Sequence, residues 1–232
     1  MPAPLLPLLT RPFKENGPLT LCFFGDSITQ GCFAYGEPPD YVAVYHEVLR
    51  RRLAAAYPQM PVNVLSAARR GDNLAMGLER IERDVLAHRP DVTFVCFGAN
   101  DAWGDDPALF GRRLTEAIER ITAVGSRVVL MTQHHMNKRL SPDVHPDLTE
   151  VARRMAERQN GGIVASFFAE TRRVAAERDL PLCDVWARYD EMEKEGVDTD
   201  ALLANRINHP TREVHRDIYA AMLFDLMTAP AL

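Results

Sequence analysis

Four residues of types that take part in acyl transfer occur where a predicted strand ends or a predicted helix begins. Ser27 closes a Gly-Asp-Ser triplet directly after the apolar run Leu19–Phe24. Gly71 and Asn100 follow two later apolar runs, and His209 stands with a proline just before the last predicted helix. Each feature alone is common at ordinary turns and helix starts. Their occurrence together, in this order, indicates a site for nucleophilic catalysis.

These residue types match the steps of acyl transfer at an ester carbonyl. A serine hydroxyl becomes a nucleophile when a base removes its proton, and histidine, with an ordinary pKa of about 6.5, suits that task. The tetrahedral intermediate then carries negative charge that preorganised donors must stabilise. The backbone N–H groups of Ser27 and Gly71 and the side-chain amide of Asn100 could supply three such donors. Asp26 is expected to cap the helix that follows it, and Asp101 to fix the adjoining loop.

The elements that must position these residues alternate along the chain between short apolar runs and longer amphipathic stretches. Strands are predicted at Leu19–Phe24, Val62–Ala67, Val92–Phe97, Val128–Thr132 and Leu180–Val185. Helices are predicted at Tyr41–Tyr57, Leu74–His88, Pro107–Val124, Leu148–Glu177 with a break at residues 160–162, and Thr211–Met227. The strands are continuously apolar, as strands covered on both faces should be.

This alternation predicts an α/β fold with a doubly wound, mostly parallel five-stranded sheet and helices on both faces. Active sites in such folds lie beyond the carboxyl ends of the strands, where the residues described above occur. We expect one domain over residues 19–232, preceded by an N-terminal arm over residues 1–18. The arm carries five prolines, is expected to be irregular, and could reach a second copy of the chain in a homo-oligomer.

Composition excludes several classes of function. The chain has 232 residues, 47% of them apolar and 25% charged, with a formal net charge of −5. This balance is that of a globular domain and gives no indication of a nucleic-acid partner. No apolar run approaches the roughly 20 residues that span a bilayer. The N-terminus lacks the pattern of a signal peptide.

The four cysteines, Cys22, Cys32, Cys96 and Cys183, have the spacing of neither a disulfide framework nor a zinc site. Three of them lie inside predicted strands and are expected to be small core residues. We therefore expect reduced thiols and a cytoplasmic location.

The sequence blocks around these residues resemble the SGNH, or GDSL, hydrolase family. The segment FFGDSITQG resembles its first block, with Ser27 in the nucleophile position, and VCFGANDAW resembles its third block, with Asn100 as the asparagine. Gly71 and His209 match the glycine of the second block and the histidine of the last one. The resemblance implies a flavodoxin-like three-layer α/β/α domain. It also implies hydrolysis of small-molecule esters through an acyl-enzyme, without metal or cofactor.

The chain departs from the family where an aspartate usually stands three residues before the histidine. That position holds Arg206, which cannot accept a hydrogen bond from the imidazole. Two alternatives follow. A neutral oxygen could orient His209, from the side chain of Asn205 or Asn208 or from a backbone carbonyl of residues 205–207. Alternatively, a displaced carboxylate, Asp198 or Asp200, could fold back onto the ring.

The sequence context favours His209 over the other histidines as the base. His145 also precedes a proline and follows an aspartate, but a predicted strand still comes after it. His134 and His135 are expected to be pocket or structural residues. We expect His46, His88 and His215 to be solvated or partly buried residues of helices.

The substrate is encoded only weakly. The segments after Ser27 and after the fourth predicted strand are long and polar, which favours small acyl esters, such as acetyl groups on a carbohydrate, over long-chain lipids. Tyr35, Trp103 and Phe110 could stack on a sugar ring or simply pack. A lysophospholipase or thioesterase would use the same residues, and loss of the aspartate would also suit a catalytically impaired binding domain. A flavin or nucleotide site is disfavoured because the first strand lacks a phosphate-binding glycine motif.

Overall fold

The computed structural model describes residues 3–104 and 106–230. Its centre is a five-stranded sheet in the order β2-β1-β3-β4-β5, with every neighbouring pair parallel. The strands are β1 (Leu19–Gly25), β2 (Val62–Ala68), β3 (Val92–Cys96), β4 (Arg127–Thr132) and β5 (Leu182–Asp184). This is the strand order of flavodoxin-like sheets. The predicted α/β fold and its five strands are therefore confirmed.

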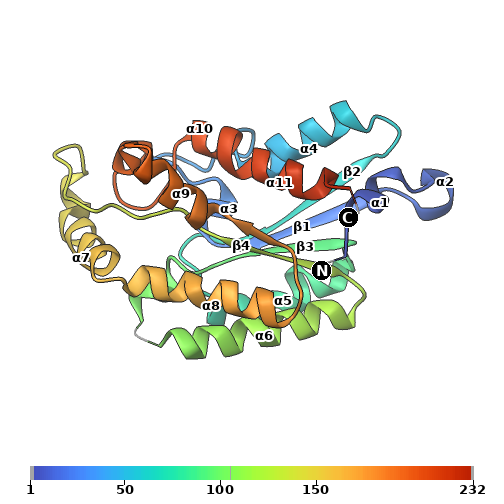
Figure 1. Ribbon diagram of the computed structural model, residues 1–232, viewed down its shortest axis with the longest axis horizontal. Coiled ribbons are helices and arrows are strands. Elements are labelled where there is room, and N and C mark those ends of the chain that lie inside the picture. The colour runs from blue at the N-terminus through green and yellow to red at the C-terminus, as the bar shows by residue number, and fades with distance from the viewer. Residues whose placement is uncertain (1–2, 105, 231–232) are drawn as a thin grey trace.

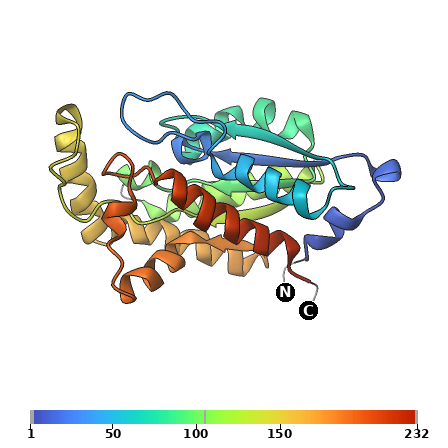
Figure 2. The same ribbon diagram turned by 90° about the horizontal axis from the view of Figure 1, so that it is seen from above.

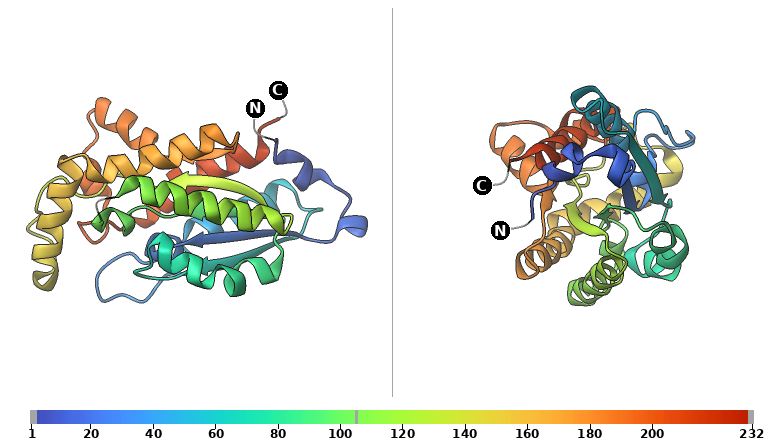
Figure 3. Two further views of the ribbon diagram at one scale, coloured as in Figure 1. Left: turned by 90° about the horizontal axis from the view of Figure 1, so that it is seen from below. Right: turned by 90° about the vertical axis from the view of Figure 1, so that its right-hand side faces the viewer.

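Helices cover both faces of the sheet (Figure 1). They are α1 (Leu6–Thr10), α2 (Phe13–Asn16), α3 (Ser27–Gln30), α4 (Tyr45–Ala56), α5 (Leu74–Asp84), α6 (Pro107–Ala123), α7 (Thr149–Asn160), α8 (Ile163–Glu177), α9 (Val185–Lys194), α10 (Arg212–Val214) and α11 (Ala220–Thr228). Shorter 3₁₀ or π turns are η1 (Leu86–His88), η2 (Asp101–Trp103), η3 (Pro146–Leu148), η4 (Thr199–Leu202) and η5 (His215–Tyr219). Helices α5, α6 and α8 form one outer layer, and α4, α9 and α11 form the other (Figures 1 and 3).

The core lies between the sheet and these two layers. Strands β3 and β4 are almost wholly buried, as their apolar sequences require. Strand β2 departs from the prediction of strands covered on both faces. It is the edge strand, and most of its residues are only partly buried. Along residues 3–104 and 106–230, no helix combines the length and apolar character that crossing a membrane requires.

The N-terminal arm differs from the expected irregular segment. It forms α1 and α2, and Leu5, Leu8 and Leu9 are buried in the hydrophobic core. Helix α1 packs against α11, so both described ends of the chain lie close together (Figures 1 and 3). Helix α9 was also missed, because it follows β5 without a loop. The predicted break at residues 160–162 is confirmed, with Gly162 in the left-handed region at φ 76°.

The carboxyl ends of the strands lie at the end of the molecule opposite the two termini (Figure 2). The loop of residues 31–44, between α3 and α4, and helix α7 both project at this end (Figures 2 and 3). The sheet thus directs its strand-end residues into one region, which these two segments flank.

Candidate active site

Ser27 is the first residue of α3, immediately beyond β1. The turn before it requires Gly25, since a Cβ there would lie 2.3 Å from Thr29 Oγ1 and 2.8 Å from the Cys96 carbonyl. Gly25 therefore permits close packing of α3 on the sheet, rather than an unusual backbone angle. Ser27 is 6% exposed, and it lines a pocket at the carboxyl edge of the sheet.

Asp26 holds this turn through both carboxylate oxygens. Oδ1 accepts a hydrogen bond from the Ile28 N–H at 2.9 Å and caps α3, as predicted. Oδ2 accepts from Gln133 Nε2 at 2.8 Å, and Gln133 Oε1 accepts from the Ala99 N–H at 2.8 Å. Gln133 therefore ties the Ser27 turn to the loop that carries Asn100. Burial raises the pKa of Asp26 to about 7, against the opposing effect of these hydrogen bonds.

His209 projects from a compact loop that side chains fix at both ends. Asn205 Oδ1 accepts hydrogen bonds from the backbone N–H groups of residues 207, 208 and 209. Buried His134 donates from Nε2 to the Asn208 carbonyl at 3.0 Å, while its Nδ1 lies 2.8 Å from the Tyr219 hydroxyl. The loop and the end of β4 are thus joined directly next to His209.

The imidazole of His209 bridges Ser27 and a backbone carbonyl. Its Nε2 lies 3.0 Å from Ser27 Oγ, and its Nδ1 lies 3.1 Å from the carbonyl oxygen of Phe33. A carbonyl oxygen only accepts, so Nδ1 must carry the hydrogen. In the neutral ring, Nε2 is then left with a lone pair directed at the serine hydroxyl. This tautomer is the one that a general base for Ser27 requires.

The partner of Nδ1 is therefore a neutral oxygen, but not one of those expected. The prediction that Asn205 or Asn208 accepts this hydrogen bond is wrong, because Asn205 Oδ1 binds backbone N–H groups and Asn205 Nδ2 donates to Asn208 Oδ1 at 2.9 Å. The acceptor is also not a backbone carbonyl of residues 205–207, as the other form of the prediction had it. It is the carbonyl of Phe33, in the loop after α3. Arg206, in the usual aspartate position, has φ 61° and lies 3.5 Å from Asp143.

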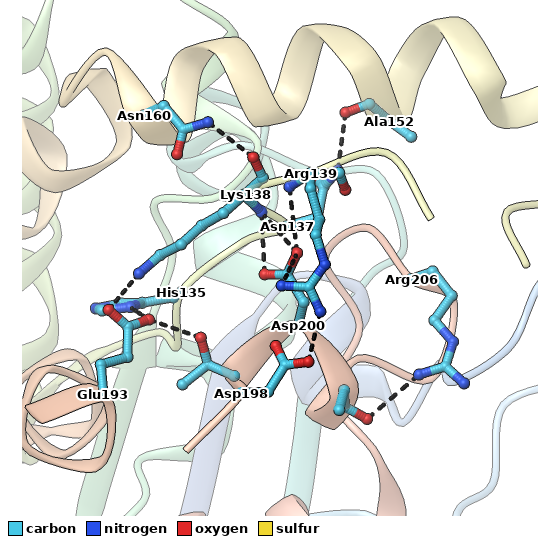
Figure 4. A network of polar contacts seen from close by, with 12 residues as sticks. His135, Asn137, Lys138, Arg139, Ala152, Asn160, Glu193, Asp198, Asp200 and Arg206 are labelled. Carbon is cyan, nitrogen blue, oxygen red and sulfur yellow. Dashed lines mark hydrogen bonds and ion pairs between the residues drawn. The ribbon is translucent and has the colours of Figure 1, made fainter. Parts of the chain in front are cut away.

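The two carboxylates weighed as alternatives have other partners (Figure 4). Asp198 forms an ion pair with Arg139. Asp200 accepts hydrogen bonds from the backbone N–H groups of Lys138 and Arg139, at 3.0–3.2 Å. These contacts join η4 to the segment after β4, and neither carboxylate accepts a hydrogen bond from the imidazole of His209.

We therefore expect Asp198→Asn and Asp200→Asn to lower turnover of an ester substrate by less than about tenfold, against the roughly 10⁴-fold cost of losing an orienting carboxylate. Asp200→Asn should lower the melting temperature, because its carboxylate holds two backbone N–H groups. Steady-state kinetics and thermal unfolding of both variants measure these effects. A thousandfold loss of turnover in either variant would instead support the alternative that this carboxylate orients His209.

Burial lowers the pKa of His209 to about 4, with the nearby positive charge of Arg70 acting in the same direction and the Phe33 hydrogen bond against it. A lowered pKa keeps the ring neutral, and able to accept a proton, down to well below pH 6. We expect NMR titration of the imidazole in the Ser27→Ala protein to give a midpoint near pH 4. The His209→Gln spectrum assigns the signal. A midpoint near the ordinary value of about 6.5 would contradict this environment.

Gly71 and Asn100 line the same pocket as Ser27 and His209. Asn100 Nδ2 donates one hydrogen to the Asp72 carbonyl at 2.9 Å, which leaves its second hydrogen for another acceptor. Gly71 has φ 82°, a conformation that favours glycine. Asp101 accepts from the Leu74 N–H at 2.9 Å, so it anchors the Asn100 turn to the start of α5. The structure thus brings the three predicted oxyanion donors and the serine–histidine pair to one pocket.

The remaining candidates separate into pocket and core residues. Tyr35 and Trp103 line the pocket, whereas Phe110 is buried in the core against Phe167. His145 is about half exposed and packs against the Tyr35 ring, and it does not contact Ser27. The expectation that the helical histidines are solvated or partly buried is wrong for His46 and His215, since both are buried.

Sequence reasoning missed two groups that the geometry places next to the site. The Phe33 carbonyl gave no signal, because every residue carries a backbone carbonyl. Gln133 directly follows β4, where the other strands carry their site residues. A polar side chain at that position was the feature of the sequence that could have identified it.

Comparisons with known proteins identify the family of the chain and its fold. Residues 23–216 match the model of the GDSL-like lipase/acylhydrolase family. No curated protein matches the sequence at a significant level.

Solved structures share the fold at low sequence identity. A lipase/acylhydrolase from Enterococcus faecalis is 24% identical, with TM-score 0.69, over 90% of this chain and 95% of that one. Axe2, an acetylxylan esterase from Geobacillus stearothermophilus, is 19% identical, with TM-score 0.70, over 91% and 95%. The acetyl xylan esterase AlAXEase is 21% identical, with TM-score 0.67, over 88% and 98%.

Proposed function

The chain belongs to the GDSL-like lipase/acylhydrolase family and is a carboxylic ester hydrolase, and on that premise we propose that it cleaves small acyl esters through an acyl-enzyme on Ser27. One observation carries the proposal. Ser27 Oγ lies 3.0 Å from His209 Nε2, in a pocket that Gly71 and Asn100 also line. A nucleophile, its base and the donors for an oxyanion are the parts that acyl transfer needs.

The reaction runs in two halves. His209 Nε2 takes the proton of Ser27 as Oγ bonds to the ester carbonyl carbon, and the oxyanion accepts hydrogen bonds from Asn100 and from the N–H groups of Ser27 and Gly71. Collapse of this intermediate breaks the bond to the alcohol oxygen, which receives the proton from His209. Water then attacks the acyl-serine by the same route, releasing the acid and restoring the hydroxyl.

The Phe33 carbonyl acts as the positioning group for the base. It fixes the ring orientation and the Nδ1–H tautomer, as a carboxylate does in a serine triad. A neutral carbonyl stabilises the imidazolium less than a carboxylate would, and its hydrogen bond raises the pKa of His209 too little to offset the lowering by burial. On this proposal the enzyme operates as a serine–histidine pair oriented by the backbone.

The pocket favours a short acyl group. Its volume is about 230 Å³, below the roughly 300–1,000 Å³ of sites that enclose drug-sized ligands. Tyr35 and Trp103 offer aromatic surface beside the serine, on which a sugar ring could stack. Two of the structural neighbours are acetylxylan esterases, and we extend that chemistry, acetyl esters of a carbohydrate, to this chain as the substrate hypothesis.

An acyl-chain series tests the proposal. Rates on p-nitrophenyl esters from acetate to dodecanoate, with an acetylated xylo-oligosaccharide beside them, should be highest for acetate. Mass spectrometry of the quenched enzyme should find the acyl group on the peptide that contains Ser27. Preference for long chains or for an acyl thioester would favour a lysophospholipase or a thioesterase. Absence of hydrolysis of every ester would identify a catalytically impaired binding domain.

A further inference from the structure

Among the residues that the structure describes, Glu37 and Arg70 are the acid and the arginine that line the active-site pocket, and they differ in whether their side chains have a charged partner. Glu37 lies 3.3 Å from Arg212, which also pairs with Asp40 at 2.9 Å. The backbone N–H of Arg70 donates to Gln30 Oε1 at 2.8 Å. Its guanidinium, in contrast, makes no hydrogen bond or ion pair with any residue in 3–104 or 106–230. The pocket therefore presents one cation whose charge no contacting acid neutralises.

The acid nearest in sequence to Arg70 is already paired with another side chain. Asp72, two residues further on, is buried and pairs with Arg80 at 2.6 Å. It also lies 3.6 Å from Arg69, whose side chain is 69% exposed. The arginine pair at residues 69–70 is thus divided between two environments. Both arginines are exposed, but Arg69 lies beside a structural carboxylate, whereas Arg70 is among the residues that line the pocket.

Arg70 lies close to the reacting groups. It directly precedes Gly71, the proposed oxyanion donor, and both residues line the pocket with Ser27 and His209. After burial, its charge contributes to the lowered pKa of His209, and it opposes the rise that burial causes in the pKa of Cys32, another pocket residue. The charge of Arg70 therefore acts on the proposed base, and an ester bound at Ser27 would lie in the pocket that Arg70 also lines.

We propose that Arg70 makes the enzyme selective for esters that carry a carboxylate close to the scissile bond. This inference rests on the proposed function and specifies its substrate class. A guanidinium presents a planar set of donors that matches a carboxylate bidentately, and hydrogen bonds between charged groups are the stronger ones. The carboxylate could lie on the acyl part or on the alcohol part of the substrate, and both arrangements present the same chemistry to Arg70.

Matched substrate pairs test the inference. For the alcohol part, 4-acetoxybenzoate is compared with methyl 4-acetoxybenzoate. For the acyl part, the p-nitrophenyl monoester of adipic acid is compared with its methyl ester. The members of each pair differ in one negative charge and one methyl group, and both this difference and intrinsic reactivity cancel when the anionic-to-neutral ratio of kcat/KM is compared between enzyme variants. Arg70→Gln should lower this ratio about tenfold or more in at least one pair.

The neighbouring arginine supplies the control. Arg69→Gln should leave the ratio unchanged in both pairs, because Arg69 faces Asp72 outside the pocket. Arg70→Lys, which retains the charge without the planar set of donors, should give an intermediate ratio. Added salt should lower the ratio of the unsubstituted enzyme. Thermal unfolding establishes that the variants are folded.

The outcomes separate this inference from the proposed function. An unchanged ratio in Arg70→Gln, whether both substrates slow equally or neither slows, would overturn the role of Arg70 in selection. The proposed function would stand in that case, provided that the neutral esters are cleaved in a Ser27-dependent manner. If the neutral esters are cleaved equally by the Ser27→Ala protein, the proposed function itself fails.

Discussion

Ser27→Ala is expected to lower kcat for p-nitrophenyl acetate by about 10⁴-fold or more, since it removes the atom that forms the acyl-enzyme. His209→Ala should have an effect of similar size, because Ser27 Oγ then loses the only base within hydrogen-bond distance among the described residues. The double variant should be no slower than either single one. Residues that act as one unit in a chemical step show such non-additive losses.

His145→Ala is the control for this series. Like His209, His145 is a histidine that directly precedes a proline, but its ring is about half exposed and packs on Tyr35. Its turnover should stay within a few-fold of the unsubstituted enzyme. Losses for Ser27→Ala and His209→Ala that multiply in the double variant would show that the two residues act independently. Retention of most activity in Ser27→Ala would end the acyl-enzyme proposal.

Asn100→Ala should lower kcat by about 10²–10³-fold, the usual cost of one oxyanion donor. The reason is that Asn100 has one amide hydrogen fixed on the Asp72 carbonyl and a second one available in the pocket. KM should change less than kcat, because the negative charge develops only in the transition state. Steady-state kinetics with p-nitrophenyl acetate give both parameters.

Asn160→Ala is the matched control for this second prediction. Asn160 Nδ2 also donates to a backbone carbonyl, that of Lys138, at 2.8 Å, but it stands at the end of α7 and does not line the pocket. Its loss should lower stability without a comparable loss of kcat. Equal kinetic losses in the two variants would mean that Asn100 acts through the fold of its loop rather than on the oxyanion.

The backbone carbonyl of Phe33 gives the site an orienting group that point mutation cannot remove. A substitution can move this carbonyl only by changing the conformation of the loop of residues 31–44, which contains Phe33. The guanidinium of Arg212 lies over the Phe33 ring, 4.4 Å from its centroid, and the same arginine pairs with Asp40. The ring of His215 also packs against the Phe33 ring, with centroids 4.8 Å apart. These contacts connect the loop to the start of the C-terminal helical segment, close to His209 in sequence.

The amino-acid sequence determined the sheet and the location of the site. Continuous apolar runs of strand length, separated by amphipathic stretches, have few ways to bury their side chains other than a parallel sheet between two helical layers. Residues that follow such strands must meet at one edge, so Ser27, Gly71 and Asn100 could be placed together without coordinates. The sequence did not predict the exposure of β2 at the sheet edge, the helices of the N-terminal arm or α9. These features depend on which elements pack against each segment.

Only the tertiary structure decided what orients His209 and which arginine faces the pocket. The acceptor for Nδ1 is a main-chain oxygen 176 positions away, and main-chain atoms are the same at every residue. Arg69 and Arg70 are adjacent and identical in type, but Arg69 lies beside a carboxylate and Arg70 lines the pocket. Side-chain type and spacing specify which chemistry is available. The direction of a single hydrogen bond or the pairing of a single charge depends on distances of a few ångströms, which folding alone fixes.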